Sequence, residues 1–433
     1  MKSRCRVWLF AVSLFACGLT ASARLQFSIV SDHADCLYRC GEVATFTVTV
    51  TESNEVRATS GEVRVRVDNF GPQEQGIYTF DLSKQNPFTV KGTLDTPGFL
   101  RLCLSGKNAK DLVWSVGYEP EKIEKGSPSP ADFDAFWSAA AARLESEVPI
   151  DAQMTRIEER STADFDFYRV SFATFGRRVH GYLSIPKDAS RAPFPVSVQV
   201  AAAGFGNWTN NMGGRKDRIN LFFAVYPFEP DWKWQEKNLK AKYDEMDAAY
   251  RKNYGTGYSC AGIADSRESY FFYPVILGIN RAINWLAARP DVDRQNFVYS
   301  GTSQGGGFGF YLCGLNKHFT KGAFFVPAIT DTLGYLKGRM SGWPRIIESQ
   351  PEQKKAEALK NAPYFDGANF AARIRIPVRV AVGFSDTTCP PCAVYAAFNA
   401  IPVADKQMTH GFGMTHSCRG DIYNKLGKWL ETR

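Results

Sequence analysis

The sequence predicts an α/β chain in two parts: a small all-β sandwich, followed by a mostly parallel sheet with helices on both faces. Three observations lead to this fold class. Residues 25–117 contain short runs of alternating apolar and polar residues, which is typical of strands with one wet face. From about residue 153, nearly continuous apolar runs alternate with helical patterns, which indicates buried parallel strands joined by helices. A glycine-rich turn at residues 301–307 joins one such strand to one such helix.

The first 23 residues read as a secretion signal. Three basic residues precede an apolar run over residues 7–19, which is too short to cross a bilayer, and an A-x-A cleavage pattern follows it. We therefore expect an exported mature chain that begins near Arg24. A lipid anchor at Cys17 is the less favoured alternative, because the phenylalanine two residues before it fits that signal poorly. No later run is long enough for a membrane helix.

Charge and cysteine usage exclude several function classes. Without the leader, the formal charge of +8 loses three positive charges and falls to +5, which is mild for this length. Because no basic block or aromatic-interleaved stripe is present, we expect no nucleic-acid binding. Export permits disulfides, and a bond from Cys36 or Cys40 to Cys103 would fasten the β-sandwich. The C-x-x-C of residues 389–392 is a weak zinc signal without a second such pair, so a structural cysteine or a local disulfide is favoured there.

The β-sandwich is placed at residues 24–118 and the α/β part at residues 119–433. We find no catalytic cluster in the sandwich and expect an accessory role for it. The strands predicted in it cover residues 44–50, 62–68, 77–82 and 98–104. The second part is predicted to hold, in order, a linker over 119–130, a helix over 132–144, a strand pair over 167–172 and 179–185, a buried strand over 194–203, helices over 232–250 and 269–288, strands over 322–326 and 377–383, and a last helix over 421–430.

The turn at residues 301–305 reads G-T-S-Q-G, which matches the G-x-S-x-G pattern of a nucleophile elbow. A strand-like run over residues 296–299 leads in, and a helix-capable run over residues 304–313 leads out. Both glycine positions need small residues, because the backbone arms of such a turn pass close together. The alternative is a glycine-rich turn that only packs a helix on a sheet. We interpret Ser303 as a catalytic nucleophile near the positive end of the following helix.

A serine nucleophile needs a histidine base within hydrogen-bond reach and an acid that orients the histidine. In the α/β-hydrolase fold, the chain order is serine, acid, histidine. Asp386 and Asp331 both follow Ser303 at predicted strand ends, and Asp386 is favoured because its loop lies at the same sheet edge as Ser303. His416, in the loop before the last helix, is the expected base. His410, which we also place in a loop, is the rival.

Five segments of the second part have the order and spacing of motifs in a known family. They are PADFDAFW at 130–137, RVHGYL at 178–183, GTSQGGG at 301–307, YFDGAN at 364–369 and GFSDTTCPP at 383–391. From about residue 125 onward, the chain resembles the acetyl xylan esterase / cephalosporin C deacetylase family of carbohydrate esterases. Together these motifs are far more specific than the serine pattern alone.

The resemblance implies a catalytic triad of Ser303, Asp386 and His416, with an oxyanion hole formed by the backbone N–H groups of Phe205 and Gln304. Phe205 lies in a glycine-rich loop just past a predicted central strand, which is where this fold builds its oxyanion hole. The resemblance further implies a serine esterase that removes acetyl groups from acetylated carbohydrates such as xylan. It implies no metal or cofactor, and it allows a homo-oligomer.

Three features depart from the family pattern. The segment YPFEP at 226–230 stands where the family has an Arg-Gly-Gln motif, and Ser417 replaces a glutamate after the late histidine. The β-sandwich and the segment 232–250 are additions. These departures leave the expected triad intact, and they bear on the substrate and on the ring-shaped hexamer that the family typically forms.

Two other functions remain compatible with the sequence. One is a serine hydrolase or acyl-transfer enzyme for a different ester, thioester or peptide. The other is a glycan-binding protein without catalysis, which is disfavoured because all three expected triad residues are present.

Overall fold

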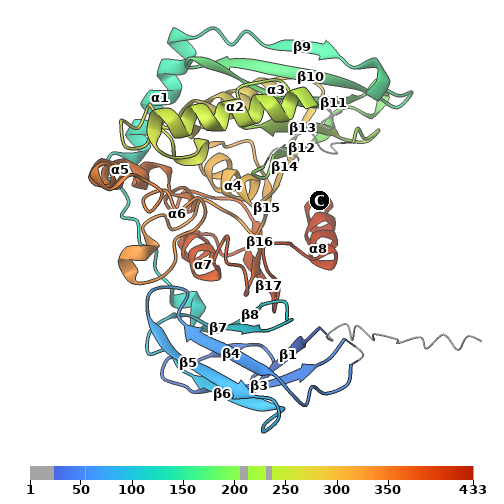
Figure 1. The fold of residues 1–433 in the computed structure, drawn as a ribbon. Coiled ribbons are helices and arrows are strands. Elements are labelled where there is room, and N and C mark those ends of the chain that lie inside the picture. The colour runs from blue at the N-terminus through green and yellow to red at the C-terminus, as the bar shows by residue number, and fades with distance from the viewer. Residues whose placement is uncertain (1–23, 54, 205–212, 231–236, 433) are drawn as a thin grey trace, which may run out of the picture.

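The computed structural model describes residues 24–53, 55–204, 213–230 and 237–432. Within these ranges, the strands form three sheets of three, five and nine strands. The two small sheets come from the N-terminal region, and the nine-stranded sheet comes from the rest of the chain (Figure 1). The predicted secretion signal at residues 1–23 lies outside the described residues, so export stays a prediction.

The N-terminal region is all-β, as predicted. The three-stranded sheet has the order β1 (Gln26–Ser31), β3 (Ala44–Thr51) and β6 (Phe88–Gly92). The five-stranded sheet has the order β2 (Leu37–Tyr38), β8 (Leu112–Tyr118), β7 (Gly98–Gly106), β4 (Glu62–Asp68) and β5 (Glu74–Asp81). Along β4, Val63, Val65 and Val67 are buried while Arg64 and Arg66 between them are exposed. Strand β4 therefore buries one face in the sandwich and carries polar residues on the other.

The nine-stranded sheet has the order β17 (Lys406–Gly411), β16 (Val378–Gly383), β15 (Lys321–Phe325), β14 (Val292–Thr302), β12 (Phe194–Val200), β13 (Ile219–Ala224), β11 (Arg177–Pro186), β10 (Phe165–Thr174) and β9 (Gln153–Arg156). The strands from β17 to β13 are parallel, and the pairings from β13 to β9 are antiparallel. The carboxyl ends of the parallel strands therefore meet at one edge of the sheet, where loops can carry a site.

Helices cover both faces of this sheet, which confirms the predicted fold class (Figure 1). The α-helices are α1 (Phe133–Glu147), α2 (Lys237–Tyr254), α3 (Phe272–Ala287), α4 (Gln304–Leu315), α5 (Lys355–Asn361), α6 (Gly367–Ala371), α7 (Pro391–Ala400) and α8 (Gly420–Glu431). Successive residues of β15 point to opposite faces. Phe324 packs on Phe310 of α4 at a ring distance of 4.8 Å, and Phe325 stacks on Tyr423 of α8 at 4.3 Å.

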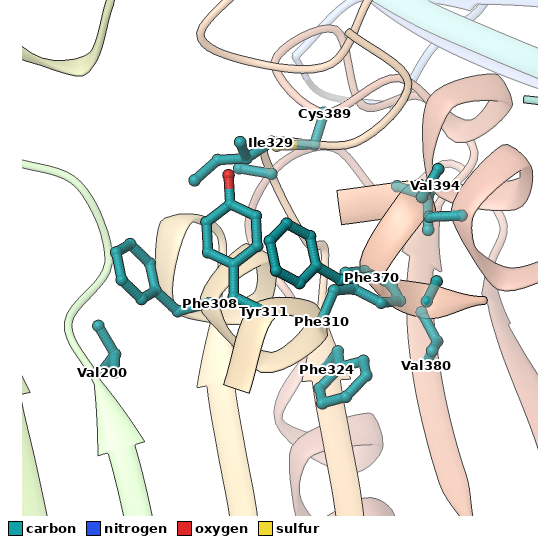
Figure 2. Packing of buried hydrophobic residues seen from close by; sticks show 14 of the residues in the cluster. Val200, Phe308, Phe310, Tyr311, Phe324, Ile329, Phe370, Val380, Cys389 and Val394 are labelled. Atoms are coloured by element: carbon teal, nitrogen blue, oxygen red, sulfur yellow. The ribbon is translucent and has the colours of Figure 1, made fainter. Parts of the chain in front are cut away.

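Helix α4 is apolar nearly all round, because it is buried between the sheet and its neighbouring helices. Figure 2 shows Phe308, Phe310 and Tyr311 of α4 beside Phe324 of β15 and Phe370 of α6. The ring centroids of Tyr311 and Phe370 lie 4.6 Å apart, and each of the five side chains is almost fully buried. Helix α4, which follows the glycine-rich turn, is therefore held rigidly by its neighbours.

The N-terminal region packs directly against the loops at the ends of β16 and β17. The Ser115 hydroxyl of β8 donates to the carbonyl of Phe384, and Phe99 of β7 contacts the Phe384 ring edge-on at 5.0 Å. The indole of Trp114 lies against Gly413, where an added Cβ would come within 2.7 Å of the ring. Figure 1 shows β7 and β8 beside β17. Phe99, Ser115 and Phe384 are buried in this contact, and Trp114 and Gly413 are partly buried, so the contact holds the two parts together.

The segment predicted as a linker is held in place by hydrogen bonds. The Lys125 ammonium donates to the side chain of Asn369 at 2.6 Å, and the Gly126 N–H donates to Asp331 at 2.5 Å. Ser127 is buried and donates to Asp366. Because these bonds reach the loop after β15 and the start of α6, the segment is anchored to the hydrolase part rather than being a flexible connection.

Two expectations were wrong, the disulfide in the sandwich and the placement of His410. The described cysteines are all free thiols, so no disulfide fastens the sandwich in this structure. Cys389 and Cys392 are buried free thiols, which agrees with the structural-cysteine alternative for the C-x-x-C segment. Cys36 is buried next to Ser31, whereas Cys103 lies on the outer face of its sheet, so the two side chains lie in different environments. His410 lies in strand β17 rather than in a loop.

None of the helices in the described ranges combines the length and the apolar composition needed to cross a bilayer.

Asp68 and Arg101 form a buried ion pair whose removal is expected to destabilise the N-terminal region. Two bonds of 2.7 and 2.8 Å join them, and both side chains are less than a tenth exposed. Asp68→Asn leaves the Arg101 charge without its partner, so we expect a loss of about 3–5 kcal/mol in the free energy of unfolding, measured by urea denaturation. Asp81→Asn, at an exposed ion pair of the same sheet, is the control with little change. Equal stability of both variants would contradict the expectation.

Candidate active site

The candidate nucleophile lies where β14 turns sharply into α4. Ser303 has a backbone φ of 55° and ψ of −119°, a conformation that L residues rarely adopt. Its N–H donates to the carbonyl of Phe325 at 2.9 Å, and its carbonyl accepts from the N–H groups of Gly307 and Ala328, each at 2.9 Å. These bonds hold the turn in its strained conformation from both sides.

Two glycines allow the backbone arms of this turn to pass each other. A Cβ on Gly301 would lie 2.3 Å from the carbonyl oxygen of Gly305. A Cβ on Gly305 would lie 2.1 Å from the carbonyl oxygen of Val200 at the end of β12. Because the opposing atoms are backbone, no side-chain movement can relieve such a contact. The prediction that both positions need the smallest residue is therefore confirmed.

His416 bridges Ser303 and Asp386. Its Nε2 lies 2.9 Å from the Ser303 Oγ, and its Nδ1 lies 2.8 Å from the Asp386 Oδ2. Asp386 is fully buried, and its Oδ1 accepts the N–H groups of Thr388 at 2.8 Å and Cys389 at 2.9 Å. The carboxylate is thereby fixed, and an imidazole with its proton on Nδ1 presents a free lone pair to the serine. The structure brings together the three residues that the sequence singled out.

The three residues differ in exposure in a way that suits nucleophilic chemistry. The Asp386 carboxylate is sealed from water, Ser303 is nearly buried, and a third of the His416 side chain is exposed. The acid is therefore protected while the base stays accessible to a proton donor or acceptor from a substrate. A serine hydroxyl, a base at hydrogen-bond distance and an orienting carboxylate are the groups that acyl transfer requires.

Cys389 is a neighbour of this group. The ligand atoms of Asp386, Cys389 and His416 all lie within 4.8 Å of one another, which makes them candidate metal ligands. Burial raises the pKa of the Cys389 thiol well above its usual range, so the thiol stays neutral. The atoms of Asp386 and His416 already bond each other and Ser303. The arrangement therefore fits proton transfer better than metal binding.

The rival acid and base lie elsewhere and have other partners. Asp331 is buried, and its carboxylate accepts from Arg339 at 2.8 Å and from the Gly126 N–H. Burial raises the pKa of Asp331, and the Arg339 guanidinium opposes that rise. The His410 Nε2 lies 2.7 Å from the Tyr395 hydroxyl, and burial lowers the pKa of His410. Neither rival makes a hydrogen bond to Ser303 or His416 within the described residues.

Of the two predicted oxyanion donors, Phe205 lies outside the described residues, and Gln304 is the first residue of α4. Backbone N–H groups in the first turn of a helix have no acceptor within the helix, and the helix dipole favours negative charge there. The Gln304 side chain is fully buried. Its Nε2 donates to the carbonyl of Ala201 at 3.2 Å, and its Oε1 accepts the Tyr258 hydroxyl at 3.0 Å.

Sequence reasoning missed two tyrosines that extend this network. The Tyr258 hydroxyl lies 3.4 Å from that of Tyr226, and the Tyr226 hydroxyl accepts the Gly204 N–H at 3.2 Å. Gly204 is thereby tied to the nucleophile turn, directly before Phe205. Tyr226 is the first residue of the segment that departs from the family motif. That departure was the signal in the sequence that could have pointed to Tyr226. Tyr243 of α2 packs edge-on against Tyr226 at 5.3 Å, so the added segment supports the network.

Comparison with known proteins places this geometry in a family. Residues 119–431 match the family model of acetyl xylan esterase (AXE1). The chain belongs to this family. It is therefore a carboxylic ester hydrolase, and the family supports an acetyl esterase activity.

The sequence similarity to a known protein extends beyond the hydrolase part of the chain. The chain is 29% identical over 379 residues to acetyl esterase Axe7A of Xylanibacter ruminicola, a match that covers 86% of this chain and 82% of that relative. This match is longer than residues 119–431, so it reaches into the N-terminal all-β region.

Two solved structures share the α/β-hydrolase fold with this chain. An acetyl xylan esterase from Paenibacillus sp. R4 has a TM-score of 0.59 at 22% identity, and covers 72% of this chain and 98% of its own. Acetyl xylan esterase 1 from a Thermoanaerobacterium species has a TM-score of 0.59 at 20% identity, and covers 72% of this chain and 96% of its own. At these identities, the likeness shows the fold alone.

The nucleophile turn of this esterase gives a steric prediction. In Gly305→Ala, the new Cβ meets the Val200 carbonyl, so we expect the free energy of unfolding to fall by at least about 3 kcal/mol. Gly427→Ala in α8 is the matched control, because a Cβ there meets no atom within 4 Å. It should gain about 0.5–1 kcal/mol from helix propensity. Urea denaturation followed by circular dichroism measures both, and a Gly305→Ala protein as stable as the wild type would contradict this account.

Proposed function

We propose that this chain is a serine esterase that removes acetyl groups from acetylated carbohydrates, such as xylan or xylo-oligosaccharides, through an acyl-enzyme on Ser303. The observation that carries the proposal is the hydrogen-bonded line from Ser303 through His416 to Asp386, in a chain of the acetyl xylan esterase family. The same line is what a Ser-His-Asp triad needs for general-base activation of its serine.

In the proposed acylation step, the His416 Nε2 takes the proton of Ser303 while the serine Oγ forms a bond to the acetyl carbonyl carbon. The carbonyl oxygen becomes an oxyanion, and the backbone N–H groups of Gln304 and Phe205 are the proposed donors to it. In comparable sites, removing one donor costs about 2.7–4 kcal/mol. The ester bond then breaks, and the sugar oxygen leaves with the proton from His416. Asp386 keeps the imidazole in its tautomer and stabilises its positive form.

In the proposed deacylation step, a water molecule attacks the acetyl-serine carbonyl and gives a proton to His416. The bond between the carbonyl carbon and the Ser303 Oγ breaks, the serine regains its proton from His416, and acetic acid leaves and ionises to acetate and a proton. His416 thus carries each proton that moves to or from the serine and sugar oxygens. The proposed cycle therefore uses no metal and no cofactor.

We also propose that the mature protein acts outside the cytoplasm, because the first 23 residues have the pattern of a secretion signal. In this proposal residues 24–118 form an accessory β-sandwich domain and residues 119–433 form the catalytic domain. The family match begins at residue 119, which supports that boundary.

Acetate release tests the proposed function. The chain from Arg24 onward is incubated with acetylated xylo-oligosaccharides, and in parallel with p-nitrophenyl acetate and butyrate. We expect acetate release from the sugar, and a loss of at least about 10⁴-fold in kcat for Ser303→Ala, because the nucleophile is gone. Turnover of only the synthetic esters would keep the serine mechanism and remove the carbohydrate substrate. Equal activity of Ser303→Ala and the wild type would remove both.

The role of Asp386 has its own test. In Asp386→Asn, the amide N–H₂ can face His416 and force its proton onto Nε2, so the base can no longer accept the serine proton. We expect kcat to fall about 10⁴-fold while the fold is kept, as in comparable triads. His318→Gln is the control, because His318 lies beyond the C-terminal end of α4, away from Ser303. Comparable kcat values for the two variants would argue against the assigned acid.

A further inference from the structure

A groove of about 430 Å³ lies between the five-stranded sheet and the loop that carries Asp386. Its floor comes from β4, β7 and β8, and its hydrolase wall is Thr387, the residue directly after Asp386. Thr387 is exposed, whereas Asp386 is fully buried. The groove therefore borders the loop that carries Asp386.

The groove floor is the outer face of the five-stranded sheet. Directly opposite residues of paired strands share a face. Arg64 lies opposite Ser105, Arg66 lies opposite Cys103, and Asp68 lies opposite Arg101. Because the valines between them fill the sandwich core, this row of polar residues is turned away from the sandwich and toward the hydrolase part.

Positive charge prevails along this row. Three arginines line the groove, against Asp111 at its rim and the buried Asp68. Both Asp68 oxygens already accept from Arg101, and Arg66 shares one of them at 3.1 Å. Arg64 is exposed and, among the described residues, has no carboxylate within 4 Å. Its guanidinium is therefore available to an anion from outside the chain.

A fourth arginine, Arg345, is bonded to Thr387 but does not line the groove. The Arg345 guanidinium is exposed and donates to the Thr387 carbonyl at 3.0 Å. In the described part of the chain, Arg345 also has no acidic partner within 4 Å. The charge of the groove thus continues toward the loops of the hydrolase part.

The groove is fixed relative to the triad. Ser115, two residues along β8 from the groove residue Val113, bonds to the carbonyl of Phe384. Beside β4, the Phe70 carbonyl accepts the Met340 N–H at 2.6 Å. A ligand bound in the groove therefore has a defined position relative to Ser303, without any movement of the two parts.

We propose that this groove is a substrate subsite, which binds a carboxylate-bearing sugar unit of the same carbohydrate chain that carries the acetyl ester. This inference rests on the proposed carbohydrate esterase function. A planar carboxylate matches the paired donors of a guanidinium, which gives geometric selection as well as charge. A neutral sugar would leave the Arg64 charge without a counterion. The exposed Asp111 at the rim can accept hydroxyl groups of the same unit.

The test compares two acetylated xylo-oligosaccharides of equal length, one with a uronic acid unit and one without. The measured quantity is the ratio of kcat/KM for acetate release from the acidic and the neutral substrate. We expect a ratio above one for the wild type, and a fall of about ten-fold in Arg64→Gln, because a charge-assisted pair is lost. The preference of the wild type should also weaken as salt is raised.

Arg57→Gln is the matched control, because Arg57 is an exposed arginine of the same region that does not line the groove. Its ratio should equal that of the wild type. A wild-type ratio of one, or an equal fall in Arg57→Gln and Arg64→Gln, would overturn the subsite while leaving the esterase function in place.

A failure of the proposed function gives a different result. If neither sugar releases acetate while p-nitrophenyl acetate is still hydrolysed, the carbohydrate esterase function is wrong. Calorimetry with a non-acetylated uronic acid oligosaccharide then tests the groove alone. Binding to the wild type that weakens about ten-fold in Arg64→Gln supports the groove as a carboxylate site. Absence of binding to the wild type overturns it.

Discussion

The strained backbone of Ser303 is the constraint on which the rest of the site depends. Its positive φ costs about 1–3 kcal/mol and persists only where the surroundings enforce it. The enforcement comes from β15 through the Phe325 carbonyl, and from the two glycines that let β12 and α4 approach the turn. The apolar packing around α4 contributes as well, because a shift of this helix would allow the Ser303 backbone to leave its strained conformation. The serine oxygen is thus placed by the packing of the central sheet.

Asp386 and His416 are placed by a different set of contacts. Asp386 and His416 lie on loops after β16 and β17, near the side of the sheet that the N-terminal region covers. Ser115 holds the Phe384 carbonyl on the acid loop, and Trp114 packs against Gly413 on the histidine loop. The all-β region is therefore part of the scaffold that aligns His416 with Ser303.

Sequence patterns predicted the fold class and Ser303, because these depend on local signals. Asp386 and His416 were preferred over Asp331 and His410 by chain order, strand ends and the family resemblance. Alternation identified β4, a continuous apolar run identified β12, and a strand–turn–helix context identified Ser303. The two tyrosines behind Gln304 escaped prediction, since Tyr226 and Tyr258 meet only through tertiary packing. The placement of His410 in β17 also escaped, because an edge strand with few apolar residues reads like a loop.

The arginine groove shows why the accessory region could not be interpreted from sequence. Arg64 and Arg66 alternate with valines. That pattern predicts a strand with one polar face, but it does not predict which part of the protein packs against that face. Only the docking of β8 on the loop after β16 turns this face into the floor of a groove that has Thr387 as its wall. The reaction and the recognition of the substrate are thus encoded separately. Under the proposed function, short motifs within residues 301–416 would carry the chemistry, and the contact between the two parts would determine which neighbouring sugar unit reaches the groove.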